Sequence, residues 1–213
     1  MAEKEIIGSY RELPLGSWMD IQSICKDESL EDLDRQVKII SILTGLTENQ
    51  VLNLPIPKYK EYVIASRFLE RESPDNHTRC AKSYRIGGYK CIPLSDYRKL
   101  SVAQYVDFQT FSKMGEDYFV QMLSCFLVPE GMTYNKGYDI VELQEAMRED
   151  LSVADALTLS AFFFKRCVLS IKDTLTFLHR VVRELPKEKR AEVEEKLKML
   201  ENRLLTNGDG LRM

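Results

Sequence analysis

LPLGSWMDIQSI at residues 13–24 is followed 87 residues later by LSVAQYVDFQTF at residues 100–111. In both runs an aromatic residue, an aliphatic residue, Asp, an apolar residue, Gln, a hydroxyl residue and an apolar residue follow one another in the same order. The apolar positions recur every three or four residues, which is the spacing of one helix face. The repeat therefore predicts two related helical units. We expect their framework to be Trp18, Ile21, Tyr105, Phe108 and Phe111.

The composition is that of a globular chain. It has 213 residues, of which 44% are hydrophobic, so it can furnish the core of one domain or of two small ones. A net charge of −3 gives no overall attraction to nucleic acid or to an anionic membrane. Its five cysteines lack metal-ligand spacing and indicate reduced thiols. The first residues contain no apolar run typical of a signal peptide, and charges interrupt the longest apolar segment. The expected location is the cytoplasm.

Working outward from the two runs, we expect a mainly α protein of five parts. These are an arm over residues 1–12, a helical unit over 13–72, a connector with a β-hairpin over 73–99, a second helical unit with a long helix over 100–185, and a charged amphipathic helix and tail over 186–213. In the first unit the periodicity predicts helices over 16–25, 30–44 and 59–70, with a short helix after Thr47. In the second it predicts a helix that opens at the capping-box residues 101–104, and helices over 118–127, 139–148 and 152–185.

Local cap and turn signals support these expectations. Thr47 with Gln50, and Ser101 with Gln104, have capping-box spacing. The adjacent glycines 87 and 88 lie between two runs of alternating polarity, which predicts a tight hairpin turn.

The hairpin is the first candidate binding site. Basic and aromatic residues alternate there, including Tyr84, Arg85, Tyr89 and Lys90. Such residues could contact phosphates and stack on bases, so a nucleic-acid-contacting protein is the alternative functional hypothesis. A solvated hairpin whose charges protect its edges, or a site for an acidic protein, explains the same residues.

The second candidate binding site is an apolar stripe near the end of the chain. Leu197, Leu200 and Leu204 recur at three- and four-residue intervals within a charged segment. This pattern predicts an amphipathic helix that docks on a partner or folds back on the chain.

The sequence offers no catalytic, cofactor-binding or metal-binding residues that we can name. His77 and His179 have no further ligand at a metal-binding offset, and no Cys or Ser has an activating base nearby in the sequence. Asp20 and Asp107 are paired by the repeat and could do acid–base work. The simpler interpretation is that each hydrogen-bonds a neighbouring helix end or loop. We therefore expect a binding protein rather than an enzyme.

Several longer motifs resemble a known family. YRIGGYK at residues 84–90, LSVAQYVDFQ at 100–109, LSCFLVPEG at 123–131 and YNKGYD at 134–139 resemble proteins of tailed bacteriophages that infect Bacteroidetes, crAss-like phages included. IISILTGLT at residues 39–47 is similar to phage tail-assembly chaperones. The resemblance spans roughly residues 13–166.

This resemblance implies a non-enzymatic protein of phage assembly. Its partners would be phage structural proteins of the tail, neck or portal region, and a homo-oligomer is left open. It would act in the cytoplasm of the infected host, or be carried in the virion as a neck, tail or cargo component.

Overall fold

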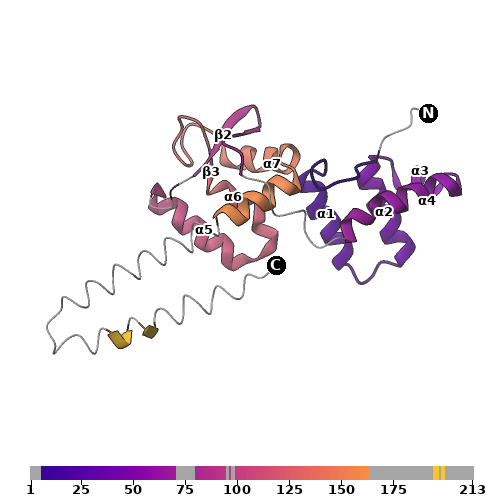
Figure 1. Ribbon diagram of the computed structural model, residues 1–213, viewed down its shortest axis with the longest axis horizontal. Coiled ribbons are helices and arrows are strands. Elements are labelled where there is room, and N and C mark those ends of the chain that lie inside the picture. The colour runs from indigo at the N-terminus through magenta and orange to yellow at the C-terminus, as the bar shows by residue number, and fades with distance from the viewer. Residues whose placement is uncertain are drawn as a thin grey trace. The chain divides into compact units, whose positions relative to one another are not determined.

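The computed structural model describes residues 6–70, 80–94, 96, 99–163, 194–196, 198 and 199. The chain divides into two compact units, residues 1–163 and residues 164–213. The first unit is mainly helical with a small antiparallel sheet, which confirms the predicted fold class (Figure 1). Its helices are α1 (Leu15–Lys26), α2 (Asp32–Thr44), α3 (Glu48–Leu52), α4 (Ile56–Ala65), α5 (Val102–Met114), α6 (Phe119–Ser124) and α7 (Ile140–Asp150), with 3-10 turns η1 (Ser66–Glu70) and η3 (Glu116–Tyr118). Another helix begins at residue 153 and is described as far as residue 163.

Both copies of the repeated sequence are helical, and both helices begin at the third residue of the copy. Leu15 starts α1 and Val102 starts α5. The N-caps differ as expected, because Pro14 offers no side-chain bond whereas Ser101 and Gln104 form the predicted capping box. The second predicted capping box, between Thr47 and Gln50, is also confirmed and starts α3.

The predicted start of the fourth helix is wrong. The sequence suggested Tyr59, after a break at two prolines, but α4 already begins at Ile56. Pro57 fits there because the first turn of a helix has no internal partner for its N–H groups, so a missing N–H costs nothing. The helix then ends at Ala65, and the remaining residues to Glu70 form η1.

The predicted hairpin is confirmed, and it gains a third strand. Strands β1 (Tyr84–Ile86) and β2 (Tyr89–Pro93) are joined by Gly87 and Gly88, whose φ angles are 56° and 79°. Strand β3 (Leu127–Pro129) pairs antiparallel with β2, where the sequence predicted the end of a helix. Alternating burial along Leu127–Pro129 matches a strand with one face on the core. The hairpin therefore completes its sheet within its own chain.

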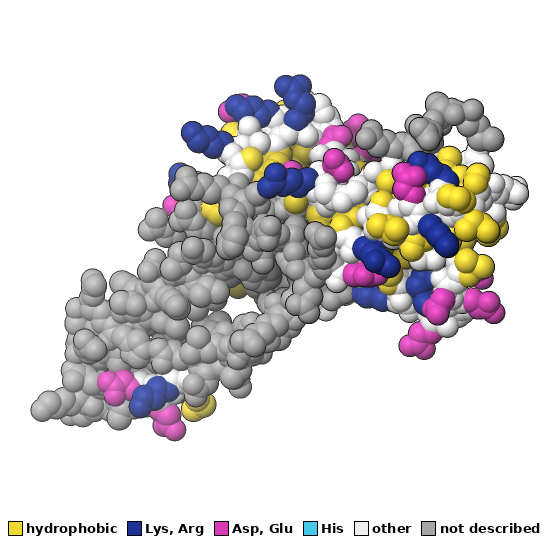
Figure 2. Space-filling view, turned by 45° about the vertical axis from the view of Figure 1, so that its right-hand side comes forward, with side chains coloured by type: hydrophobic (Ala, Val, Ile, Leu, Met, Phe, Trp, Pro, Cys, Tyr) yellow, Lys and Arg dark blue, Asp and Glu magenta, His cyan; other side chains and the backbone are white. Residues whose placement is uncertain are grey.

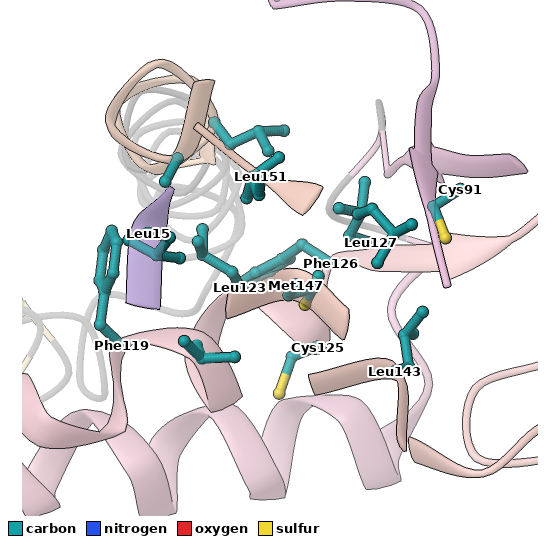
Figure 3. Close-up of a cluster of buried hydrophobic side chains, with 14 of the residues drawn as sticks. Leu15, Cys91, Phe119, Leu123, Cys125, Phe126, Leu127, Leu143, Met147 and Leu151 are labelled. Carbon is teal, nitrogen blue, oxygen red and sulfur yellow. The ribbon is translucent and has the colours of Figure 1, made fainter. Parts of the chain in front are cut away.

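The largest core cluster draws on elements from both of the predicted helical units. Leu15 from α1 is buried with Leu123, Leu127, Met147 and Leu151, and their side chains point toward one another (Figure 3). Two smaller clusters hold α1–α4 together, one around Ile21 and Leu43 and one around Ile40 and Tyr62. Residues 13–72 and 100–163 thus contribute to one compact unit, in which α1 packs on α7.

Two backbone hydrogen bonds join the beginning and the end of this unit. The Leu15 N–H donates to the Leu151 carbonyl oxygen at 2.8 Å, and the Val153 N–H donates to the Leu13 carbonyl oxygen at 2.9 Å. Leu13 and Val153 are both fully buried. These bonds fix the start of α1 against the end of α7.

Most of the predicted long helix and the docking stripe Leu197, Leu200 and Leu204 lie outside the described residues. Residues 194–196, 198 and 199 are helical. Within the part of the chain that is described, no helix has the length and apolar character needed to cross a membrane.

Candidate interaction surfaces

Helix α5 carries apolar side chains on opposite sides. Its inner side packs on the core, where Phe108 meets Phe126 edge-to-face at a centroid distance of 4.9 Å and Phe111 stacks on Tyr118 at 6.1 Å. Gln104 is buried beside them, and its Nε2 donates to the Cys125 carbonyl oxygen at 2.9 Å. These contacts fix which side of α5 faces inward.

The outer side of α5 is also apolar. Val102, Tyr105 and Val106 have relative exposures of 80%, 46% and 52%. Their spacing of three and four residues places them on one side of the helix, and we call these three residues the α5 face. Exposed apolar side chains that lie together on one side of a helix mark a candidate contact surface. The outer side of α5 therefore has the character of a contact surface.

The equivalent side of α1 is covered within the protein. The repeat aligns Leu15 with Val102, Trp18 with Tyr105, and Met19 with Val106. Leu15 is fully buried, and Trp18 and Met19 pack against the same core cluster. One copy of the repeated helix thus has its partner, whereas the other copy presents the same positions to solvent.

The close packing of α1 on α7 depends on a small residue. A Cβ placed on Gly16 would lie 3.0 Å from the Arg148 Cβ and 3.1 Å from the Arg148 carbonyl oxygen.

Of the five expected framework residues, Ile21 is buried, and Trp18, Phe108 and Phe111 pack against the core. Tyr105 is the exception, because it belongs to the exposed α5 face.

A second exposed apolar surface lies over α3 and α4. Leu52, Ile56 and Ile64 are exposed by 61%, 70% and 62%, and Lys60 lies between the two isoleucines on the same side of α4. We call these four residues the α4 face. Figure 2 shows apolar side chains gathered over the region of α2–α4, with basic and acidic side chains beside them. The opposite side of α4 is anchored by buried Tyr62 and by Tyr59, whose hydroxyl donates to Gln36 Oε1 at 2.8 Å.

Sequence reasoning missed the α4 face because it started the helix at Tyr59. The signal was present in the spacing, since residues 56, 60 and 64 follow one another at four-residue intervals. Once Pro57 is placed in the first helical turn, Ile56 and Ile64 fall on one side. That side is opposite to the buried Tyr62.

The hairpin places its basic and aromatic residues on different sides. Tyr84 and Tyr89 pack against the core, and Tyr89 also contacts the Tyr138 ring at a centroid distance of 6.5 Å. Arg85 and Lys90 lie directly opposite each other on the exposed side, and Lys90 forms an ion pair with Glu130 at 2.9 Å. The two tyrosine rings thus have intramolecular neighbours, and the nucleic-acid hypothesis depends on the cations alone.

The two repeat-related aspartates act separately. Asp20 accepts a charged hydrogen bond from Arg148 at 3.2 Å, at the end of α7, and Asp107 accepts from the Tyr134 hydroxyl at 2.9 Å. This confirms the interpretation that each bonds a neighbouring helix end or loop.

The buried thiols are held in their protonated form. Burial raises the pKa of Cys91 and of Cys125 to about 11 in each case. The thiolate, which is the nucleophilic form of cysteine, is therefore disfavoured at both positions. In the described ranges, no group of three or more His, Cys, Asp or Glu side chains could hold a metal ion.

Comparisons with known protein families, with curated proteins and with solved structures find no match to this chain. The class of protein is defined here by the fold and its surfaces. Over the described residues it is a mainly helical protein in which α4 and α5 each present apolar side chains to solvent.

Proposed function

We propose that this chain is a non-enzymatic bacteriophage assembly protein, similar to tail-assembly chaperones, that binds other phage structural proteins through its helical faces. The observation that carries the proposal is the exposure of the α5 face to solvent. Its α1 counterpart is covered by the rest of the fold, whereas Val102, Tyr105 and Val106 are exposed. The sequence resemblance supplies the phage context, including a place in the neck, tail or cargo of the virion.

The size of the α5 face suits reversible association. Covering a side chain such as valine contributes about 1.5–3 kcal/mol when it goes from full exposure to full burial, and those of the α5 face start partly covered. The loss of translational and rotational freedom on association offsets several kcal/mol of this gain. A partner held by this face alone would therefore be released readily, as a chaperone requires.

Among the described residues, the two repeat-related aspartates and two of the thiols have structural roles. Asp107 is engaged by Tyr134, Asp20 by Arg148, and the thiols of Cys91 and Cys125 are buried. Asp20 is exposed and Asp107 is half-buried, but each is held by a hydrogen bond within the protein. This favours binding over catalysis.

The test is capture of partners from phage-infected cells with two matched valine variants. Val106→Glu puts a charge on the α5 face, whereas Val141→Glu makes the same change at a valine of α7 that is similarly exposed, 58% against 52%. Wild type and the Val141 variant should capture phage structural proteins, identified by mass spectrometry, and the Val106 variant should lose them. Circular dichroism on both variants checks that the helices are intact.

Equal capture by both variants would contradict the assignment of the α5 face. Capture of host proteins alone would contradict the phage-assembly function. Mass spectrometry of purified virions separates an assembly factor, which is absent from the particle, from a neck, tail or cargo component, which is present.

A further inference from the structure

The α4 face alternates apolar and basic side chains along one line of the helix. Ile56, Lys60 and Ile64 are each one step of four residues apart, and Arg67 follows three residues after Ile64, in η1. Steps of three and four residues keep side chains on the same side of a helix. The line extends over about 16 Å, at 1.5 Å per residue along a helix.

The positive charges on this line have no ion-pair partner in the part of the chain that the structure describes. Lys60 and Arg67 are exposed, and neither forms an ion pair or a side-chain hydrogen bond with any residue that the structure describes. The adjacent Lys58 differs, because it pairs with Glu61 at 3.0 Å. The α4 face and the adjoining Arg67 therefore combine exposed isoleucines with cations that have no ion-pair partner among the described residues.

We propose that the α4 face binds an amphipathic helix of a partner protein whose apolar stripe is flanked by Asp and Glu residues. A row of side chains at four-residue intervals forms a ridge that fits the groove of a second helix. The isoleucines would be covered by the apolar stripe, and the carboxylates would meet Lys60 and Arg67. Carboxylates are selected because an uncharged or basic neighbour would leave Lys60 without a counter-charge between two covered isoleucines.

This inference rests on the protein-binding part of the proposed function, but not on the α5 face or on the phage context. It concerns the α4 face, which contains Lys60, whereas the three residues of the α5 face are uncharged. The experiment below uses purified full-length protein and no phage components, so the two proposals can fail independently.

The test is selection from a displayed library of helical peptides about 18 residues long, or roughly 27 Å. Their outward positions are randomised among apolar, acidic, basic and neutral polar residues. We expect wild-type protein to enrich peptides with an apolar stripe and flanking Asp or Glu. The double variant Lys60→Glu, Arg67→Glu should instead enrich Lys and Arg beside the same stripe. The control Lys113→Glu, at an exposed lysine of α5, should give the wild-type preference.

Affinity measurements on an enriched peptide sharpen the result. Lys60→Glu should weaken binding by on the order of tenfold at about 50 mM salt, and by much less at about 500 mM, where exposed charges are screened. Ile56→Ser with Ile64→Ser should weaken binding at both salt concentrations, because apolar burial is not screened. Both isoleucines are exposed, so these changes should leave the fold intact.

Three outcomes would overturn the proposal. One is that no peptide is enriched over a library displayed without bait. Another is that enriched peptides have no acidic preference, or keep it in the charge-reversed variant. The third is that the wild-type protein binds vesicles of phosphatidylglycerol or a DNA duplex more tightly than it binds the enriched peptide, and that Lys60→Glu abolishes this binding.

Discussion

Replacing Gly87 with alanine should destabilise the protein more than the same replacement at Gly88. Both glycines lie in the hairpin turn and both have positive φ angles, 56° and 79°. A Cβ on Gly87 would lie 3.1 Å from the Ala146 Cβ of α7, whereas a Cβ on Gly88 would meet nothing within 4 Å. The turn is further fixed by the Gly87 N–H, which donates to Asp150 Oδ2 at 2.8 Å.

The expected magnitudes follow from two separate costs. A left-handed backbone costs an alanine about 1–2 kcal/mol at either position. Gly87→Ala adds overpacking against α7, which costs about 1–3 kcal/mol. We therefore expect Gly88→Ala to lower the free energy of unfolding by about 1–2 kcal/mol and Gly87→Ala to lower it by about 2–5 kcal/mol.

Urea unfolding measures both values, provided that the slope with denaturant is unchanged. A double-mutant cycle with Ala146→Gly isolates the contact, because that change removes the opposing Cβ at a cost of about 1 kcal/mol for a glycine inside a helix. Gly87→Ala should then cost less in the Ala146→Gly background than in wild type. Equal losses at the two glycines, or no coupling in the cycle, would refute the docking of the turn on α7.

The other predictions concern a buried glutamine and two thiols. Gln104→Ala removes the glutamine half of the α5 capping box and leaves the buried Cys125 carbonyl without its donor, so it should cost about 2–3 kcal/mol, against about 1 kcal/mol for Gln50→Ala in the exposed capping box of α3; equal urea midpoints would argue against this. At about pH 8 an alkylating reagent should modify exposed Cys25 before buried Cys91 and Cys125, as read by peptide mass mapping, and early labelling of Cys125 would contradict its burial. Because burial raises the pKa of these two thiols from 9.0 to about 11, their contribution to stability should be constant below about pH 9 and lost as the pH rises toward 11. Urea midpoints across that range should fall less steeply in Cys125→Ala than in wild type.

The features that could be predicted from the sequence are those fixed by residues close together in the chain. The capping boxes need only a side chain and a backbone N–H three residues apart, and both formed where expected. The hairpin turn needs only two adjacent glycines with positive φ, and it also formed. In a natural sequence such local signals usually agree with the global fold.

One missed feature depends on residues far apart in the chain, and the other has a local cause. Strand β3 exists because Leu127 and Pro129 pair with Pro93 and Cys91, and nothing within residues 118–127 indicates that pairing. The start of α4 was missed for a local reason, namely that Pro57 was taken as a helix break rather than as a first-turn residue.

The candidate site shows the same limit. The repeat correctly predicts the same spacing of apolar residues in α1 and α5. It does not indicate which of the two helices has its apolar side chains covered by the rest of the protein. Packing of α7 on α1 settles that question, and it leaves Tyr105 exposed where Trp18 packs on the core. The α5 face therefore emerges only when the sequence repeat and the tertiary contacts are compared.

The central claim is that the α5 face contacts a partner protein during phage assembly, and site-specific photocrosslinking tests it most directly. A photoreactive phenylalanine analogue replaces Tyr105 on the α5 face or, as a control, Val141 on α7. After illumination of infected cells, position 105 should form a covalent adduct with a phage structural protein, and position 141 should not. The absence of an adduct at position 105, or the same adducts at both positions, would contradict the claim.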